Sequence, residues 1–156
     1  MEPSPARRLE GRRTKRALID EELARFRRDL RPEVSQMPHL VRSMLDYIHE
    51  HLFDPMLNAN TVKARCGIRN NNIATRFRNA VGMGVRDYIE WLRMQAALRL
   101  LAYQHLEVFL IGLAVGYAYH ESFCRTFHRL FQCTPSEYRL RAGFPGEEVL
   151  RVKVKE

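Results

Sequence analysis

The sequence predicts an all-α protein with about seven core helices, arranged as two similar units joined by one long linker helix. Apolar residues recur at the three- and four-residue spacing of amphipathic helices from Pro38 to Arg141, and no segment alternates convincingly at period two. A pattern of aromatic and apolar residues also repeats after 50 positions. We therefore expect a helical domain over residues 39–142, a basic N-terminal arm with a short helix over 1–38, and a flexible tail over 143–156.

The N-terminal region differs from the rest of the chain in its charge and its weak apolar periodicity. Its first 38 residues include ten basic and seven acidic side chains. They predict a flexible basic arm from Arg7 to Arg16, followed by a short amphipathic helix from about Ala17 to Asp29. Because the residue before a proline avoids helical dihedrals, this helix should end before Pro32.

Periodicity and capping signals define the helices that frame the repeated units. An apolar stripe predicts a helix over Leu40–Leu52, which Asp54-Pro55 stops. A second stripe predicts a linker helix over about Val85–Tyr103. A last helix should start at Thr134-Pro135-Ser136-Glu137, which is a capping box with proline at the first helical position.

Each copy of the repeat consists of a short helix, a turn of glycine and an apolar residue, and a longer helix with two buried residues four apart. The pairs separated by 50 positions are Ile73/Phe123, Phe77/Phe127, Val81/Phe131 and Tyr88/Tyr138. The segments of the two copies are Thr61–Cys66, Gly67-Ile68 and Asn70–Val81, then Val108–Val115, Gly116-Tyr117 and His120–Phe131. Glycine supplies the positive φ that reverses the chain between two helices, so each copy is typical of a helix-turn-helix. Two copies in a basic chain favour DNA binding over a generic helical bundle.

The charge balance points to a polyanionic partner. The 156 residues contain 26 Lys and Arg against 18 Asp and Glu, which gives a net charge of +8. Of the basic residues 22 are arginines, whose guanidinium forks onto phosphates and base edges better than a lysine ammonium does. A GC-rich genome that encodes arginine often would produce the same bias, so composition raises nucleic acid as a partner without deciding it.

Several protein classes are excluded by what the sequence lacks. Its apolar runs fall well short of the ~18 residues that a membrane span needs, and no apolar run follows the N-terminal charges as a secretory signal requires. No P-loop, G-x-S-x-G, H-E-x-x-H or C-x-x-C motif is present, so we expect neither an enzyme nor a cofactor. Three cysteines without C-x-x-C predict reduced thiols in a cytoplasm.

From about Leu40 to Arg139 the chain resembles the C-terminal DNA-binding domain of the AraC/XylS family of bacterial transcription regulators. The most specific match is Val115-Gly116-Tyr117, then Glu121-Ser122-Phe123-Cys124-Arg125-Thr126-Phe127 and Thr134-Pro135-Ser136-Glu137-Tyr138-Arg139. Further matches are Tyr47–Leu52, Gly82-x-x-Val85-Arg86-Asp87-Tyr88-Ile89-x-x-Leu92-Arg93 and Ala97-x-x-Leu100-Leu101. The resemblance implies a double helix-turn-helix in a regulator that binds duplex DNA, acts as an activator and touches RNA polymerase.

Four positions depart from the family pattern. Lys63 and Gly112 stand where the family has a small Ala early in the first helix of each unit, and Gln132 replaces Gly after the second recognition helix. Arg69 replaces the usual Ser cap of the first recognition helix, and we expect Asn70 to take over the capping. The second unit is therefore the better preserved.

Base-facing residues are expected opposite the buried pairs, toward the N-terminal end of each recognition helix. In the first copy they are Asn71, Ala74 and Thr75, positions at which similar family members touch bases. In the second copy the 50-residue offset yields His120, Glu121, Cys124 and Arg125. Arg125 is the strongest candidate, because Arg to guanine O6 and N7 is the commonest specific pair. Glu121 would accept from cytosine N4, or pair with Arg125 one turn later.

Phosphate contacts set register and affinity without carrying sequence information. We expect them from Arg76, Arg78, Ser122, His128 and Arg129, with ordinary surface polarity of these side chains as the alternative. A linker helix of about 19 residues, ~28 Å long, lets two recognition helices reach major-groove faces one turn (~34 Å) apart. The chain should therefore cover an asymmetric site as a monomer and bend it.

Three of the base-facing and phosphate candidates also suggest metal chemistry. His120, Cys124 and His128 recur every four residues, and Cys133 follows. Because side chains four apart on a helix rotate by about 40°, three ligands on one straight helix strain a tetrahedral site, and we expect no metal. A redox-sensing Cys124 is a further alternative.

Two other interpretations stand beside a sequence-specific regulator. A degenerate family member would bind RNA polymerase or another regulator through its helices without reading DNA. A non-specific nucleic-acid binder would depend entirely on the Arg7–Arg16 arm, whose deletion should otherwise weaken binding only in part. We expect a short stand-alone regulator in the cytoplasm, associated with the nucleoid, and a fragment of a longer gene is the alternative.

Overall fold

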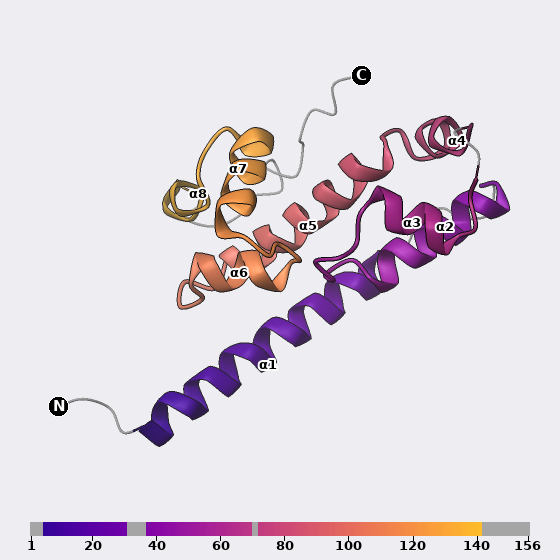
Figure 1. Ribbon diagram of the computed structural model, residues 1–156. Helices are drawn as coiled ribbons and strands as arrows, with labels where there is room; N and C mark the ends of the chain where they lie inside the picture. The colour runs from indigo at the N-terminus through magenta and orange to yellow at the C-terminus, as the bar shows by residue number, and fades with distance from the viewer. Residues whose placement is uncertain (1–4, 31–36, 70–71, 142–156) are drawn as a thin grey trace.

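The computed structural model describes residues 5–30, 37–69 and 72–141, with the side chains of the first helix described from Thr14 onward, and these residues form eight α-helices and no strand (Figure 1). The helices are α1 (Pro5–Asp29), α2 (His39–Glu50), α3 (Ala59–Arg65), α4 (Asn72–Val81), α5 (Val85–Leu101), α6 (Val108–Ala114), α7 (His120–Phe131) and α8 (Pro135–Arg141). The all-α prediction is confirmed. Helices α2–α4 form the first unit, α6–α8 form the second, and α5 joins them.

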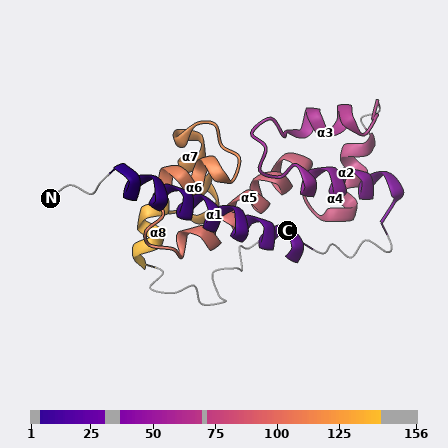
Figure 2. The same cartoon turned by 90° about the horizontal axis from the view of Figure 1, so that it is seen from below.

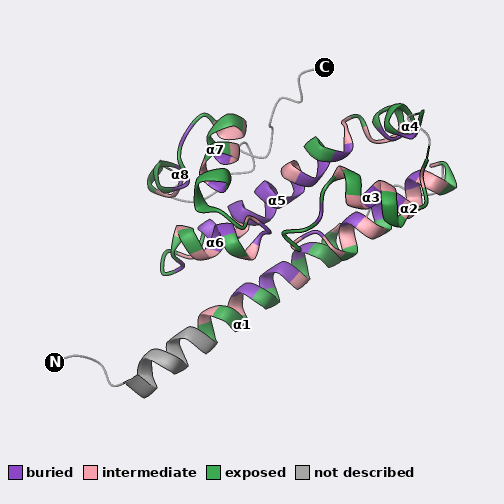
Figure 3. Cartoon of the chain, in the orientation of Figure 1, coloured by how far each residue is buried: buried purple, intermediate pink, exposed green. Residues whose placement is uncertain are grey.

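The linker helix α5 lies at the centre of the molecule. Every residue from Leu92 to Leu98 is buried (Figure 3), because helices of both units and α1 pack against α5. A helix covered on several sides has no continuous polar face, unlike a surface helix. In Figure 1, α5 runs between α1 below it and α7 above it. The helix that connects the two units is therefore also the core of the molecule.

The two units repeat the same aromatic contact, as the 50-residue spacing predicts. In the first unit Phe77 of α4 meets Tyr88 of α5 edge-on, with 5.8 Å between the ring centroids. In the second unit Phe127 of α7 meets Tyr138 of α8 edge-on, again at 5.8 Å. Edge-to-face pairs of this kind are favourable beyond their buried area. In both units the longer helix is thus fixed to the helix that follows it.

The two turns have the same backbone geometry. Gly67 and Gly116 adopt φ angles of 68° and 108°, which glycine reaches without the steric cost that a Cβ atom imposes. The amide of the residue after each glycine donates to the carbonyl five residues earlier, at 3.0 Å in both units. These bonds satisfy carbonyls at the ends of α3 and α6 that have no partner within the helix.

Two arginines bind carbonyls at the ends of helices, one between the linker and the first unit and one between the second unit and the linker. Arg93 of α5 donates to two carbonyls just after α2, those of Leu52 at 2.9 Å and Asp54 at 2.7 Å. Arg139 of α8 donates at 3.1 and 3.2 Å to the two carbonyls that lie 49 residues later, at the end of α5. A cation is favourable at the carbonyl end of a helix dipole. The carbonyls thus keep the spacing of the repeat, whereas the arginines are 46 positions apart and reach them from non-equivalent positions.

The N-terminal region differs from the prediction. Residues 5–29 form one helix, α1, so the expected flexible arm over Arg7–Arg16 and separate helix over Ala17–Asp29 are wrong. Proline is well tolerated at the first helical position, and the following Ala, Arg, Leu, Glu and Lys residues are good helix formers. The helix also packs onto the core, through the buried side chains of Ile19, Leu23 and Phe26. The expected tail over 143–156 lies outside the described residues.

The capping signals are partly confirmed. Thr134 and Glu137 form the predicted capping box, with reciprocal bonds of 3.0 and 3.1 Å between side chain and backbone amide. A second box starts α3 at Ala59, two residues earlier than expected, because Asn58 and Thr61 cap each other's amides at 3.0 and 2.9 Å. None of the described helices combines the length and apolar composition that crossing a membrane requires.

Candidate nucleic-acid interface

Helix α7 has one apolar and one polar face, and the predicted contact residues of the second unit share the polar face. Phe123 and Phe127 are fully buried against α6, α8 and the core. Residues three or four apart lie on the same side of a helix. The exposed residues are His120, Glu121, Ser122, Arg125, His128 and Arg129, and Cys124 is half-buried beside them. All seven predicted residues of the second unit thus lie outside the buried stripe of α7, six of them exposed and Cys124 half-buried.

A glycine in α6 allows α7 to pack unusually close. A Cβ atom built on Gly112 would lie 2.9 Å from the ring of Phe123, which is too close for a real contact. The departure from the family's small Ala is therefore compensated by Phe123, which occupies the space of the missing methyl group. Close packing of this kind fixes the position of α7 relative to α6, because a close-packed interior has low compressibility and neither helix can move toward the other.

The end of α7 carries backbone strain at the second departure from the family pattern. Gln132 has a φ of 58° in the left-handed region, where a residue with a Cβ atom costs roughly 1–2 kcal/mol more than glycine. Its side-chain amide donates to the Arg129 carbonyl at 3.0 Å. This bond satisfies one of the last carbonyls of α7 and offsets part of the strain.

Arg129, a predicted phosphate contact, already has a partner within the molecule. Its guanidinium forms an ion pair with Glu90 of α5, which also pairs with Arg86 at 3.3 Å. The Glu90 side chain is only 16% exposed, so the pair is partly shielded from water. The contact connects the C-terminal end of α7 to the linker helix. A phosphate at this position would have to replace the Glu90 carboxylate.

Arg125 differs from Arg129 in having no such partner. Within the described part of the chain, neither Arg125 nor Glu121 takes part in an ion pair. The alternative pairing of these two residues along the helix is therefore not formed in this structure. Both side chains are exposed near the N-terminal end of α7, the end that a helix-turn-helix presents to base edges.

Helix α4 repeats the arrangement at the other end of the linker. Ile73 and Phe77 are buried, and the exposed predicted contacts are Ala74, Thr75, Arg76 and Arg78. The structure describes α4 from Asn72. Asn71, the third predicted base contact of this unit, and its expected cap Asn70 lie outside the described residues.

The His120–Cys124 pair does not extend to a larger ligand cluster. The Cys124 sulfur lies 3.4 Å from Nε2 of His120, one turn earlier on α7. Among the residues that the structure describes, no three His, Cys, Asp or Glu side chains lie close enough to hold a metal ion. Partial burial raises the pKa of the Cys124 thiol, which disfavours the thiolate that metal binding and oxidation require.

Two exposed aromatic residues beside α7 were not anticipated from the sequence. Tyr119, the N-cap residue of α7, is 74% exposed, and Phe109 of α6 is 53% exposed with its ring centroid 5.9 Å from that of His120. The sequence of α6 could have indicated an exposed apolar residue, because all seven of its residues are apolar or glycine. A helix at the surface leaves one side uncovered, so part of such a helix must face solvent. These rings border the predicted base-facing residues.

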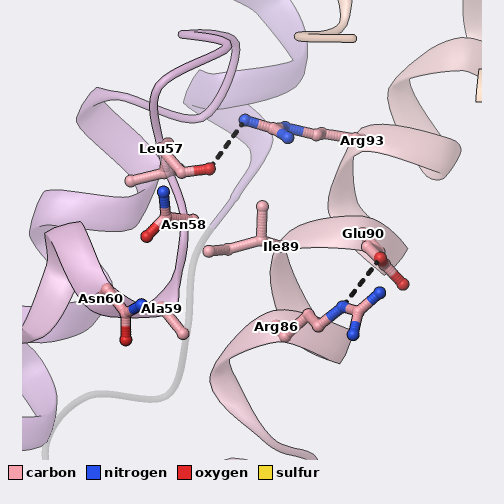
Figure 4. A pocket seen from close by; sticks show the side chains of 8 residues that line it. All are labelled: Leu57, Asn58, Ala59, Asn60, Arg86, Ile89, Glu90 and Arg93. Atoms are coloured by element: carbon pink, nitrogen blue, oxygen red, sulfur yellow. Dashed lines mark hydrogen bonds and ion pairs between the residues drawn. The ribbon is translucent and has the colours of Figure 1, made fainter. Parts of the chain in front are cut away.

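A hollow of about 310 Å³ separates the start of α3 from α5 (Figure 4). Its polar lining is internally bonded: Arg86 pairs with Glu90, and Arg93 donates to the Leu57 carbonyl at 3.4 Å. Burial lowers the pKa of Arg93. The Arg93 guanidinium donates to the carbonyls of Leu52, Asp54 and Leu57, and these bonds connect the first unit to the linker helix.

Sequence comparison identifies regulators similar to this chain. A family model described as a helix-turn-helix domain matches residues 63–141. Regulatory protein SoxS of Escherichia coli K12 is 30% identical over 102 residues, which cover 65% of this chain and 94% of that protein. The F1 operon positive regulatory protein of Yersinia pestis is 29% identical over 100 residues, 64% of this chain and 33% of that protein. The transcriptional activator RclR of Escherichia coli K12 is 39% identical over 70 residues, 45% of this chain and 25% of that protein.

Solved structures share the fold. The C-terminal domain of AraT from Geobacillus stearothermophilus aligns with a TM-score of 0.65 at 22% identity, covering 71% of this chain and 92% of that chain. The DNA-binding domain of AdpA, solved with a target DNA, aligns with 0.59 at 21% identity, covering 66% and 92%. A probable AraC family regulator from Rhodopseudomonas palustris aligns with 0.55 at 25% identity, covering 67% and 98%.

Proposed function

The chain belongs to the AraC family of helix-turn-helix DNA-binding transcription regulators, which are not enzymes. We propose that it binds an asymmetric duplex DNA site as a monomer, through α4 and α7. One observation carries the proposal: in α7 the base-facing candidates Glu121 and Arg125 are exposed, while Phe123 and Phe127 are buried in the core. Helix α4 repeats this arrangement at the other end of a buried, rigid linker.

The second unit supplies the main base contacts in this proposal. Arg125 donates from its guanidinium to guanine O6 and N7, and Glu121 accepts from cytosine N4. His120 and Cys124 complete the base-facing set of α7. In the first unit the base-facing residues are Asn71, Ala74 and Thr75. A methyl group on Ala74 restricts that position to an apolar contact, such as a thymine methyl.

Phosphate contacts are assigned to the outer residues of the same helices, namely Arg76, Arg78, Ser122, His128 and Arg129. Arg76 and Arg78 are exposed, and each neutralised phosphate releases a counterion. Replacing either arginine by alanine should lower the slope of log affinity against log salt by about one and weaken all sequences alike. Arg129 joins this set only by exchanging Glu90 for a phosphate.

Selection of bound fragments from random duplex DNA at physiological salt tests the proposal. A sequence-specific regulator enriches one asymmetric site spanning about two helical turns, and it binds that site roughly 10³-fold or more tighter than random competitor. Equal binding to all fragments would support a non-specific binder. No binding at all would support the alternative in which the helices engage a protein partner without reading DNA.

Arg125→Ala identifies the base-reading helix. We expect a loss of roughly 1–3 kcal/mol in discrimination at one base pair, which is about 5- to 150-fold, because a bidentate contact to guanine is removed. Thr75→Ala in α4 is the matched variant of the first unit and should cost less, because one hydroxyl makes a single contact. Competition binding against sites substituted at each position measures both. An unchanged preference in Arg125→Ala would contradict the assignment of α7.

We also propose that the protein is an activator that touches RNA polymerase and acts on the cytoplasmic nucleoid. The names of two relatives, a positive regulatory protein and a transcriptional activator, support the sign of regulation. Transcription in vitro from a promoter carrying the selected site, with purified bacterial polymerase, should rise when the protein is added. A fall in transcript would make the protein a repressor. A fluorescent fusion should co-localise with cellular DNA.

A further inference from the structure

Helix α1 contacts both helix-turn-helix units as well as the linker between them. Three residues of its C-terminal half, Ile19, Leu23 and Phe26, are buried in the common core. In Figure 1 α1 follows the lower side of the molecule, and Figure 2 shows it crossing in front of α5 and α6 when the molecule is seen from below. This position lies on the side of α5 opposite to α7 in Figure 1.

The C-terminal end of α1 is attached to the first unit. Arg27 donates from Nη1 to the carbonyl of Glu50, the last residue of α2, at 2.9 Å. Phe26 contacts Phe53, just after α2, with 6.2 Å between ring centroids. The carbonyl of Glu50 has no partner within its own helix, so the guanidinium satisfies it. These contacts connect α1 to the helix that supports α3 and α4.

The rest of α1 is attached to the second half of the molecule. Tyr103, after the end of α5, donates its hydroxyl to Glu22 at 3.0 Å. Lys15 forms an ion pair at 2.9 Å with Glu107, the N-cap residue of α6. Lys15 and Arg27 are twelve residues apart, about 18 Å along a helix. At the C-terminal end of α1, Asp29 also pairs with Arg99 of the linker helix α5 at 3.0 Å.

The covalent connection between the first unit and α5 is a glycine joint, which the contacts of Arg93 and Tyr88 with the first unit already span. α4 ends at Val81 and α5 begins at Val85, and the joint contains Gly82 with a φ of 91° and Gly84. A Cβ atom on Gly82 would meet nothing within 4 Å, whereas one on Gly84 would lie 3.5 Å from the Arg78 guanidinium. Glycine has the widest backbone freedom. Helix α1 adds a further path, which contacts the end of α2 and the start of α6 directly and bypasses both this joint and α5.

We propose that α1 is a brace that sets the distance and angle between α4 and α7, so that the chain accepts one spacing between the two halves of its DNA site. This inference rests on the proposed function, in which α4 and α7 both enter the major groove. A protein that reads two half-sites from rigidly spaced helices discriminates by half-site spacing. The brace residues never touch DNA and act by positioning the two helices that do.

The separation between α4 and α7 tests the brace without DNA. Spin labels are attached to native Cys124 on α7 and to the thiol introduced by Thr75→Cys on α4, in a background of Cys66→Ser and Cys133→Ala. The intact brace should give one narrow distance distribution. Leu23→Ala with Phe26→Ala, which weakens the docking of α1, should broaden it. Arg28→Ala, an exposed change on the same helix, is the matched control and should leave it narrow.

A charge-reversal pair keeps the test decisive if the core variant fails to fold. Lys15→Glu places two like charges together at the second unit while leaving the core intact. It should broaden the distribution, and adding Glu107→Lys should restore it. A narrow distribution in a folded Leu23→Ala, Phe26→Ala variant, or in Lys15→Glu when the core variant does not fold, overturns the proposal.

Spacing tolerance then connects the brace to specificity. One base pair is inserted between the two halves of the selected DNA site. The affinity of the wild-type chain should then fall roughly tenfold or more, because the shift misplaces at least one base contact and costs as much as one mismatched base pair. The brace variants should lose clearly less. An equal loss in all variants overturns the proposal even if the distances broaden. If the wild-type chain selects no duplex site, the proposed function fails while the distance measurement still decides on the brace.

Discussion

The two helix-turn-helix units share one repeat but differ in how closely the rest of the molecule packs against them. In the second unit the turn lies against the linker: a Cβ atom on Gly116 would come within 2.9 Å of Nε of Arg93, and one on Gly112 would clash with Phe123. In the first unit a Cβ atom on Gly67 would meet nothing within 4 Å. The same local sequence thus forms the same turn in two different environments.

The difference shows that the motif determines the turn, whereas packing determines how rigidly it is held. The second unit adds a continuous aromatic cluster, in which Phe127 contacts Phe123, Phe131 and Tyr138 with centroid distances of 6.0, 4.6 and 5.8 Å. The first unit has the shorter set of Phe77, Tyr88 and His49. We therefore expect a substitution at the turn glycine to cost more in the second unit than in the first, whereas at other positions burial of the side chain or backbone strain decides the cost.

Replacing Arg93 or Arg139, the arginines that bind carbonyls at helix ends, should have the largest effect on stability. Arg93→Met should lower the free energy of unfolding by about 3 kcal/mol, because it leaves buried carbonyls without a donor while keeping the side-chain volume. Arg139→Met should cost about 1 kcal/mol, because Arg139 is half-buried and water can replace it. Urea denaturation followed by circular dichroism measures both. Equal losses of stability in the two variants would show that burial of the arginine does not determine the cost of removing it.

The turn glycines come next. Gly67→Ala should cost roughly 1–2 kcal/mol, the price of a Cβ atom at positive φ. Gly116→Ala should cost more, by about 1 kcal/mol or above, because the new methyl group also displaces the Arg93 guanidinium. Thermal and urea unfolding of the two variants side by side gives the comparison. A cost that is the same at both turns would mean that Arg93 moves aside freely.

Exchanging the residues that follow the two recognition helices should produce smaller effects of opposite sign. Gly82 and Gln132 are equivalent positions 50 residues apart, and both have positive φ. Gln132→Gly should stabilise the chain by up to about 1 kcal/mol, because relief of strain outweighs the bond to the Arg129 carbonyl. Gly82→Gln should destabilise it by about 1 kcal/mol. A loss of stability in Gln132→Gly would show that the side-chain bond dominates.

A pH effect confined to the first unit should be the smallest. Burial lowers the pKa of His49, outweighing the opposite effect of Asp46, and its Nε2 lies 2.7 Å from the Tyr88 hydroxyl. The unfolded chain then binds a proton more readily than the folded one, so this contribution is complete above the unfolded pKa of about 6.5 and is lost as the pH falls below it. Stability should therefore decrease between pH 7 and pH 5.5.

Two histidine variants isolate this contribution. His49→Gln should flatten the dependence of the unfolding free energy on pH, while His128→Gln, an exposed change in the second unit, should leave it as in the wild type. Denaturant midpoints at pH 7 and pH 5.5 measure the effect. A pH dependence that survives in His49→Gln would assign it to other groups.

Features encoded in short stretches of sequence were predicted well. Helix α7 spans the predicted range His120–Phe131, and the capping box at Thr134 forms as expected. The positions of Phe77 and Phe127 in the core followed from the 50-residue spacing. The base and phosphate contacts remain predictions, although the described residues among them lie on the expected exposed faces.

Features that depend on distant partners were missed. The partner of Arg129 is Glu90, 39 residues earlier, and nothing near either residue in the sequence indicates the pair. The docking of α1 was also missed, because its basic N-terminal half suggested a detached arm. The amphipathic pattern over Ala17–Asp29 predicted a helix but not its partner, and the core of the protein covers Ile19, Leu23 and Phe26 of it.

The amino-acid sequence by itself determined the duplicated motif, its glycine turns, its helix caps and its family, because periodicity, positive φ and capping act over a few residues. Only the tertiary structure decided that α1 joins both units and that Arg93 supports the first unit while pressing against the second turn. Contacts such as Lys15 to Glu107 join residues 92 positions apart. Such contacts depend on where whole helices pack, which no local pattern records.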